Sequence, residues 1–155
     1  MNKGHGANIF KYSKSGDLLD FSSNINPYGP TERVKNNIRE HLDLIARYPD
    51  VSYGKLFDVL EKYLGVDKTH ISLGNGAMEV IDATISLYEN IVIFEPAFME
   101  YEIRARVQKK NIKKINLDLS FKPNVHDLDF DLDNTLVIIT SPHNPSGVSP
   151  VSYTH

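Results

Sequence analysis

The residues from Ile71 to Tyr88, with the sequence ISLGNGAMEVIDATISLY, have the composition of an anion-binding site. Gly74-Asn75-Gly76 predicts a tight turn between a short strand that ends at Leu73 and a helix that begins at Ala77. The first backbone N–H groups of a helix have no partner within it, so they can hold a phosphate or a carboxylate. Glycine lets the anion come close to the backbone. A turn and helix cap without any ligand is the alternative interpretation.

Several other kinds of site are not supported by the sequence. A dinucleotide fingerprint needs a third glycine where this chain has Glu79, and a Walker loop needs a Gly-Lys-Ser/Thr triplet that does not occur. The alternating aspartates from Asp127 to Asp133 lack the glycine and the closing glutamate of a calcium loop. There is no cysteine, and the six histidines show no close pairing. We therefore expect no metal site and no thiol nucleophile.

The elements that must position this motif follow from the hydrophobic pattern. An arm from Met1 to Pro30 contains a short strand near Leu18–Ser22 and precedes two helices. The helices are predicted over Thr31–Ala46, with Thr31 as N-cap, and over Tyr53–Leu64, which would bury Leu56, Leu60 and Leu64. Three later strands alternate with helices. They are predicted at Ile91–Phe94, Ile112–Leu117 and Leu136–Ile139, with a helix at Phe98–Lys109 between the first two.

This alternation predicts an α/β fold, a mostly parallel sheet with helices on both faces. We expect Ile91–Phe94 and Leu136–Ile139 to be buried strands, and Ile112–Leu117 to lie nearer an edge. Ligands of such sheets bind beyond the carboxyl ends of the strands. The segments we expect are an arm (1–30), a helical segment (31–66), a partial ligand-binding α/β domain (67–147) and an atypical tail (148–155).

The composition points to an ordinary globular protein. Hydrophobic residues make up 41% of the chain, and the formal net charge is −3. This charge gives no broad basic field for nucleic acid or anionic lipid, so neither partner is expected. The first residues lack the apolar core of a signal peptide, and no apolar run is long enough to span a bilayer. The expected location is the cytoplasm.

Six motifs, taken together, carry a resemblance to a known family. They are HGAN at His5–Asn8, DFSSNINPYGP at Asp20–Pro30, RYPD at Arg47–Asp50, GNGAMEVI at Gly74–Ile81, EPAF at Glu95–Phe98 and SPHNPSG at Ser141–Gly147. Their order and spacing resemble the amino-terminal part of pyridoxal-phosphate enzymes of the class I/II aminotransferase superfamily. The first two motifs look most like threonine-phosphate decarboxylases, and histidinol-phosphate aminotransferases come next.

The resemblance implies a cofactor, pyridoxal 5'-phosphate, and residues that would bind it. Gly76 and the backbone N–H groups of Ala77 and Met78 would hold the cofactor phosphate. Phe98 would stack on the pyridine ring, because a flat apolar face suits a flat cofactor. Asn144 would hydrogen-bond the phenolic oxygen of that ring. A core aromatic at Phe98 and a simple Asn-Pro turn at Asn144 are the alternatives.

The resemblance also implies roles for residues of the amino-terminal segments. Tyr48 would reach the cofactor phosphate of a neighbouring subunit, since family active sites lie at a homodimer interface. His5, Gly6 and Asn24 match positions that contact substrate in the decarboxylase-like members, which suits a phosphorylated amino acid. A disordered arm is the alternative for these three.

No residue of this chain is predicted to be catalytic. In the family, the lysine that forms the Schiff base follows the Asn-Pro-x-Gly turn, and no lysine here has that context. We therefore expect a truncated or frame-shifted product, or one piece of a longer enzyme, inactive alone. The alternatives are a non-catalytic fragment that binds phosphate compounds or a full-length partner, and an unrelated α/β phosphate-binding module.

Overall fold

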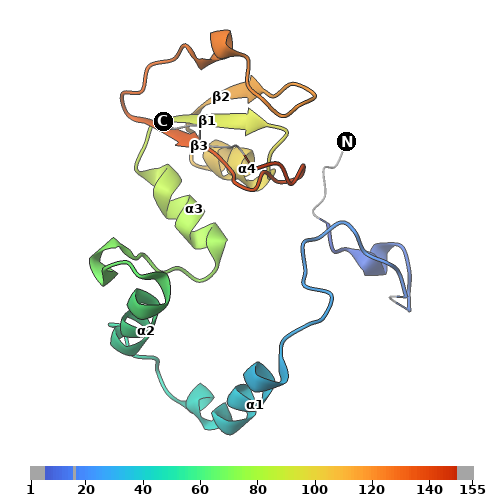
Figure 1. The fold of residues 1–155 in the computed structure, drawn as a ribbon, viewed down its shortest axis with the longest axis vertical. Coiled ribbons are helices and arrows are strands. Elements are labelled where there is room, and N and C mark those ends of the chain that lie inside the picture. Colours follow the sequence, from blue (N-terminus) through green and yellow to red (C-terminus); the bar gives the residue numbers. More distant parts are fainter. Residues whose placement is uncertain (1–5, 16, 150–155) are drawn as a thin grey trace. The chain divides into compact units, whose positions relative to one another are not determined.

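The computed structural model describes residues 6–15 and 17–149 (Figure 1). The chain divides into two compact units, residues 1–54 and residues 55–155. Each unit is described by itself. The division between them lies within the predicted helical segment, and the four segment boundaries expected from sequence stay predictions.

Among its described residues, the first unit contains one α-helix and two short 3-10 helices. They are η1 (Ile9–Lys11), α1 (Glu32–Glu40) and η2 (Leu42–Ala46). Thr31 caps α1 as predicted, because its hydroxyl accepts a hydrogen bond from the Val34 N–H at 3.4 Å. The prediction of one helix to Ala46 is wrong. The α-helix ends at His41, whose backbone leaves the helical region and whose Nδ1 lies 2.8 Å from the carbonyl oxygen of Asn37.

The strand predicted at Leu18–Ser22 does not form. The Asp20 carboxylate instead accepts hydrogen bonds from both the backbone N–H and the hydroxyl of Ser22. These bonds lower the pKa of Asp20 below its ordinary value. Local bonds of this kind hold the backbone in a turn and so compete with strand pairing.

The second unit is an α/β structure built on a parallel sheet (Figure 1). Its elements are α2 (Gly54–Leu64), η3 (Lys68–His70), α3 (Ala77–Ser86), β1 (Asn90–Glu95), α4 (Glu100–Val107), β2 (Asn111–Asn116), η4 (Val125–Leu128) and β3 (Thr135–Ile138). The strand order is β2-β1-β3, and both pairs are parallel. The parallel α/β fold predicted from the alternation of strands and helices is confirmed.

Helices α3 and α4 cover one face of this sheet. Ile91 and Ile93 of β1 are fully buried against Ile85 of α3 and Ala105 of α4. Tyr101 of α4 packs against the same cluster. Alternation along β1 sends neighbouring side chains to the opposite face. The strand is therefore buried on both sides, as its continuous apolar run predicted.

The segment between β2 and β3 contributes to the opposite face. Lys113 is the register partner of Val92 on that face. Its ammonium lies 4.9 Å from the centre of the Phe130 ring and 2.8 Å from the carbonyl oxygen of Asp129. Val92 is only 2% exposed. A lysine of the edge strand thus fastens the connecting segment over the sheet.

Three expectations about burial or pairing are wrong. Ile71–Leu73 is not a strand, since the described sheet contains only β1, β2 and β3. Leu56 and Leu64 of α2 are about half exposed, so the apolar face of this helix is not buried. The strand expected to be buried at Leu136–Ile139 is an outer strand here, only half-buried along β3, and Ile139 just beyond it is exposed.

Among the described residues, no helix is long and apolar enough to cross a membrane.

Candidate functional site

The amino terminus of α3 has the geometry of an open anion site. Gly76 precedes the helix with φ +84°, and its N–H donates to the Gly74 carbonyl oxygen at 2.8 Å. Gly76 has no side chain to cap α3, and the Glu79 carboxylate accepts a hydrogen bond from the Asn75 N–H just before the helix. As the first residues of α3, Ala77 and Met78 have no partner for their N–H groups within the helix. A Cβ placed on Gly76 would meet nothing within 4 Å. The side of Gly76 on which a Cβ would stand is therefore open.

Two loops that carry predicted site residues leave the sheet at one edge. Helix α3 leads into β1 through Leu87–Glu89. The loop that carries Phe98 follows β1, and the loop that carries Asn144 follows β3. Since β1 and β3 are parallel neighbours, both loops leave the sheet at that edge. The loops with Phe98 and Asn144, the predicted ring and amide positions, thus follow neighbouring strands at one edge of the sheet.

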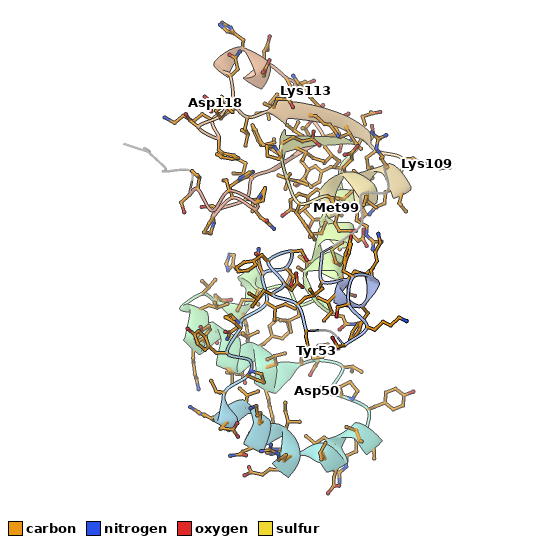
Figure 2. All side chains as sticks on the ribbon, turned by 90° about the vertical axis from the view of Figure 1, so that its right-hand side faces the viewer. Asp50, Tyr53, Met99, Lys109, Lys113 and Asp118 are labelled. Carbon is orange, nitrogen blue, oxygen red and sulfur yellow. The ribbon has the colours of Figure 1, made fainter. Side chains whose placement is uncertain are left out.

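Phe98 lies in the short connection before α4. Its ring is half-buried and meets the ring of Tyr101 edge-on, with centroids 5.6 Å apart and an interplanar angle of 87°. Figure 2 labels Met99 at the start of α4 and Lys109 just past its end. The predicted helix over Phe98–Lys109 is therefore shorter than expected, and Phe98 belongs to the loop.

Asn144 lies in the loop that follows β3. Two cis peptide bonds shape this loop, Ser141-Pro142 and Asn144-Pro145, and a third precedes Phe98 at Glu95-Pro96. The side chain of Asn144 is half-buried. Within residues 6–15 and 17–149, no protein group hydrogen-bonds its amide. The amide remains available to a ligand.

His143 had no predicted role, but in the structure it joins the loop after β3 to the loop after β1. The side chain is buried, its Nε2 lies 2.7 Å from the Pro96 carbonyl oxygen, and its Nδ1 lies 2.7 Å from Oγ of Ser146. It also borders an apolar hollow of about 180 Å³ with Phe94, Tyr101 and Ile138. A histidine directly before the motif's asparagine was the only sequence signal, and it does not reveal the contact across loops.

An ion-pair cluster fixes the base of the Phe98 loop. The Lys114 ammonium lies 2.8 Å from Oε1 of Glu95 and 2.6 Å from Oε2 of Glu102. The hydrogen bond from Lys114, and a second from Arg106, lower the pKa of Glu102. The hydrogen bonds to Glu102 and Glu95 raise the pKa of Lys114. Opposite charges at this distance favour both charged forms.

The first unit contains the remaining predicted site residues that are described. A Cβ on Gly6 would come within 1.8 Å of the Ser22 carbonyl oxygen, and the Ala7 N–H donates to Oγ of Ser22 at 2.8 Å. The HGAN and DFSSN motifs are therefore in direct contact, and Asn24 follows two residues later with an exposed side chain. Tyr48 is 98% exposed. His5 lies outside the described residues. In the described part of the chain, no group of three or more metal-ligating side chains is close enough to hold an ion.

The fold defines a class: α/β proteins with a parallel sheet, in which ligands characteristically bind beyond the carboxyl ends of the strands. The family model for aminotransferase class I and II matches residues 16–151. The chain belongs to this family, whose members depend on pyridoxal 5'-phosphate. The family resemblance carried by the six motifs is thereby confirmed.

Individual relatives give the same result. The chain is 34% identical over 143 residues to histidinol-phosphate aminotransferase of Methanocaldococcus jannaschii, covering 86% of this chain and 38% of that protein. Identity to the enzyme of the same name from Staphylococcus aureus is 36% over 146 residues, covering 88% and 40%. The chain therefore spans about two fifths of the length of these curated relatives.

Solved structures share the fold. Histidinol-phosphate aminotransferase of Clostridium acetobutylicum superimposes with a TM-score of 0.74 at 41% identity, over 83% of this chain and 39% of that one. L-threonine-O-3-phosphate decarboxylase of Porphyromonas gingivalis superimposes with a TM-score of 0.67 at 22% identity, over 85% and 40%. The second likeness supports the fold alone. None of these comparisons tests the site residues one by one, so their roles stay predictions.

Proposed function

We propose that this chain is the cofactor-phosphate part of a pyridoxal-phosphate enzyme that acts on a phosphorylated amino compound, with the remaining polypeptide supplying the catalytic lysine. The observation that carries the proposal is the start of α3, where Gly76 has a positive φ and brings no side chain in front of the first N–H groups. Half-buried Phe98 and the amide of Asn144, which no group of the described residues bonds, lie in loops that leave one edge of the sheet. Donors for a phosphate, a flat ring and one amide are the groups this cofactor requires.

Each residue would have a positional role. Ala77 and Met78 would donate their N–H groups to the phosphate, where the helix dipole adds a favourable field. Phe98 would offer a ring face, and the amide of Asn144 would donate to the phenolic oxygen. The bound cofactor supplies the electron sink for breaking a bond at the substrate's amine-bearing carbon. The chain's own residues hold and orient it.

Two substrates are in question, and the relatives favour the first. Histidinol-phosphate aminotransferases are the curated relatives at 34–36% identity, so we put amino-group transfer from histidinol phosphate first. Decarboxylation of threonine phosphate is the second candidate, because the contact of Gly6 with Ser22 joins the two motifs that resemble the decarboxylases. Assay of the polypeptide that the native cell makes, for oxo-acid-dependent amino transfer and for carbon dioxide release, distinguishes the two.

The proposal includes a homodimer in the cytoplasm. Tyr48, with its side chain almost fully exposed, could reach a neighbouring subunit's phosphate as the family resemblance implies. Sedimentation of the native polypeptide with and without a Tyr48→Ala change tests this: the variant should lose cofactor affinity while remaining a dimer. A native polypeptide that sediments as a monomer would contradict the shared site.

The cofactor site itself is tested on this chain with pyridoxine 5'-phosphate, which has no aldehyde and so cannot attach to lysines. Titration of the nitrogen-15-labelled chain should shift the amide signals of Gly76, Ala77 and Met78. Pyridoxine without the phosphate is the control and should leave them in place. Equal shifts with both compounds, or shifts confined to other residues, would reject the site.

A further inference from the structure

The imidazole of His143 joins two loops that sequence treats separately. Its Nε2 lies 2.7 Å from the carbonyl oxygen of Pro96, in the loop after β1. A carbonyl oxygen can only accept, so Nε2 carries the proton. Nδ1 of the neutral ring is then an acceptor, and the Ser146 hydroxyl at 2.7 Å donates to it. Ser146 thereby selects the tautomer that binds Pro96.

The loop around this ring is closed on itself. The N–H of His143 donates to the Val148 carbonyl oxygen at 2.7 Å, and the N–H of Gly147 donates to the His143 carbonyl oxygen at 2.6 Å. The Phe121 ring lies against the imidazole with centroids 5.4 Å apart. The side chain of His143 is only 8% exposed in total. A buried, fully bonded ring is a rigid connection.

The two ends of this connection lie next to the proposed cofactor contacts. Pro96 stands two residues before Phe98, and His143 stands directly before Asn144. The strands that carry the loops, β1 and β3, are hydrogen-bonded neighbours. The bond from Nε2 to Pro96 therefore links the two loops two residues before Phe98 and directly before Asn144.

We propose that His143 is a positioning residue that holds Asn144 at a fixed distance from Phe98, with Ser146 setting its tautomer. This rests on the proposed function, because it assigns Phe98 and Asn144 to the cofactor ring. It goes further in one respect. Binding of the cofactor ring would depend on His143, although this side chain contacts neither the ring nor the phosphate, and binding of the phosphate would not depend on it. The phosphate donors of Ala77 and Met78 belong to α3, outside this connection.

The experiment compares two probes, pyridoxine 5'-phosphate and inorganic phosphate, on the full chain. His143→Leu places an apolar side chain in the same buried position and removes both hydrogen bonds of the imidazole. It should weaken binding of pyridoxine 5'-phosphate about tenfold and leave inorganic phosphate within about twofold. His143→Gln can still donate to Pro96 and should recover most of the loss. Equal weakening of both probes, or no weakening, would overturn the positioning role.

A second readout needs no ligand. In the free protein, His143→Leu should shift the side-chain amide signals of Asn144 and the ring signals of Phe98. Phe121→Leu, which removes a neighbouring ring but no hydrogen bond of His143, should not. Ser146→Ala should change the nitrogen-15 signals of the imidazole toward a mixture of tautomers. Unmoved Asn144 and Phe98 signals would refute the inference, whereas a wild-type chain that binds both probes equally would refute only the proposed function.

Discussion

The ammonium of Lys114 in β2 lies 2.6 Å from Oε2 of Glu102 in α4. The same ammonium lies 2.8 Å from Oε1 of Glu95 at the end of β1. The Lys114 side chain thus joins β2 to both β1 and α4. The side chains of Lys114, Glu95 and Glu102 are each about a quarter to a third exposed. No local pattern in the sequence indicates this contact.

Replacing this lysine should reduce stability. Lys114→Met keeps most of the alkyl chain but leaves two partly buried carboxylates next to each other, at a cost of about 1 kcal/mol in the free energy of unfolding. Urea unfolding followed by circular dichroism measures the difference. Lys122→Met, at an exposed lysine outside the cluster, is the matched control and should change little. Equal effects of both substitutions would show that the cluster contributes nothing specific.

The same cluster predicts a pH dependence of stability. The lowered pKa of Glu102 means that its contribution is present above the ordinary value of 4.5 and is lost as pH falls through the lower, folded value. The raised pKa of Lys114 means that its contribution is present below 10.5 and is lost as pH rises through the higher, folded value. The stability difference between wild type and Lys114→Met should therefore be largest between these limits. A difference that stays constant down to pH 3 would contradict this assignment.

The backbone at Gly76 should be sensitive to any side chain. Gly76→Ala meets no atoms, but φ +84° with ψ 168° is a region that alanine rarely adopts, and the cost is about 1–3 kcal/mol. Gly65→Ala is the control, since Gly65 also has a positive φ with nothing nearby, but at the end of α2. Both variants should lose stability, measured by thermal unfolding. Only Gly76→Ala should also weaken the binding of pyridoxine 5'-phosphate. An equal loss of binding in both variants would show that Gly76 is not part of the site.

Reductive trapping tests the expectation that the chain lacks the cofactor's lysine. Borohydride reduction in the presence of pyridoxal phosphate should leave no stoichiometric adduct at a single lysine, because none has the family context. Peptide mass spectrometry locates any adduct. Scattered partial labelling of exposed lysines fits the prediction, whereas one fully modified lysine would falsify it.

The sequence correctly predicted the elements that have a clear hydrophobic pattern. The continuous apolar run predicted β1 as a strand, and the periodic apolar residues predicted α3 as a helix, because each pattern fits few other structures. The strand at Leu18–Ser22 was wrong because bonds from Asp20 to Ser22 hold that segment in a turn. Ile71–Leu73 has strand-like residues but no neighbour to pair with in the described sheet.

The site was predictable to the same extent. The sequence predicted the turn before α3 and the start of this helix, because the glycine spacing and the apolar residues of the helix lie in one stretch of chain. The contact of His143 with Pro96 joins residues 47 positions apart, and no local pattern encodes it. Phe98 and Asn144 could be placed on separate loops, but the bond that relates them could not be foreseen.

The register of the sheet has a consequence for the order of folding. Asn90 pairs with Asn111, 21 positions later, and with Thr135, 45 positions later. Doubling a loop adds about 0.6 kcal/mol of closure entropy, so β1, α4 and β2 should assemble before β3 docks. Pulsed hydrogen exchange should protect β1 and β2 amides first, and simultaneous protection of β3 would exclude this order. The loop with Phe98 would then be in place before the loop with Asn144 packs against it.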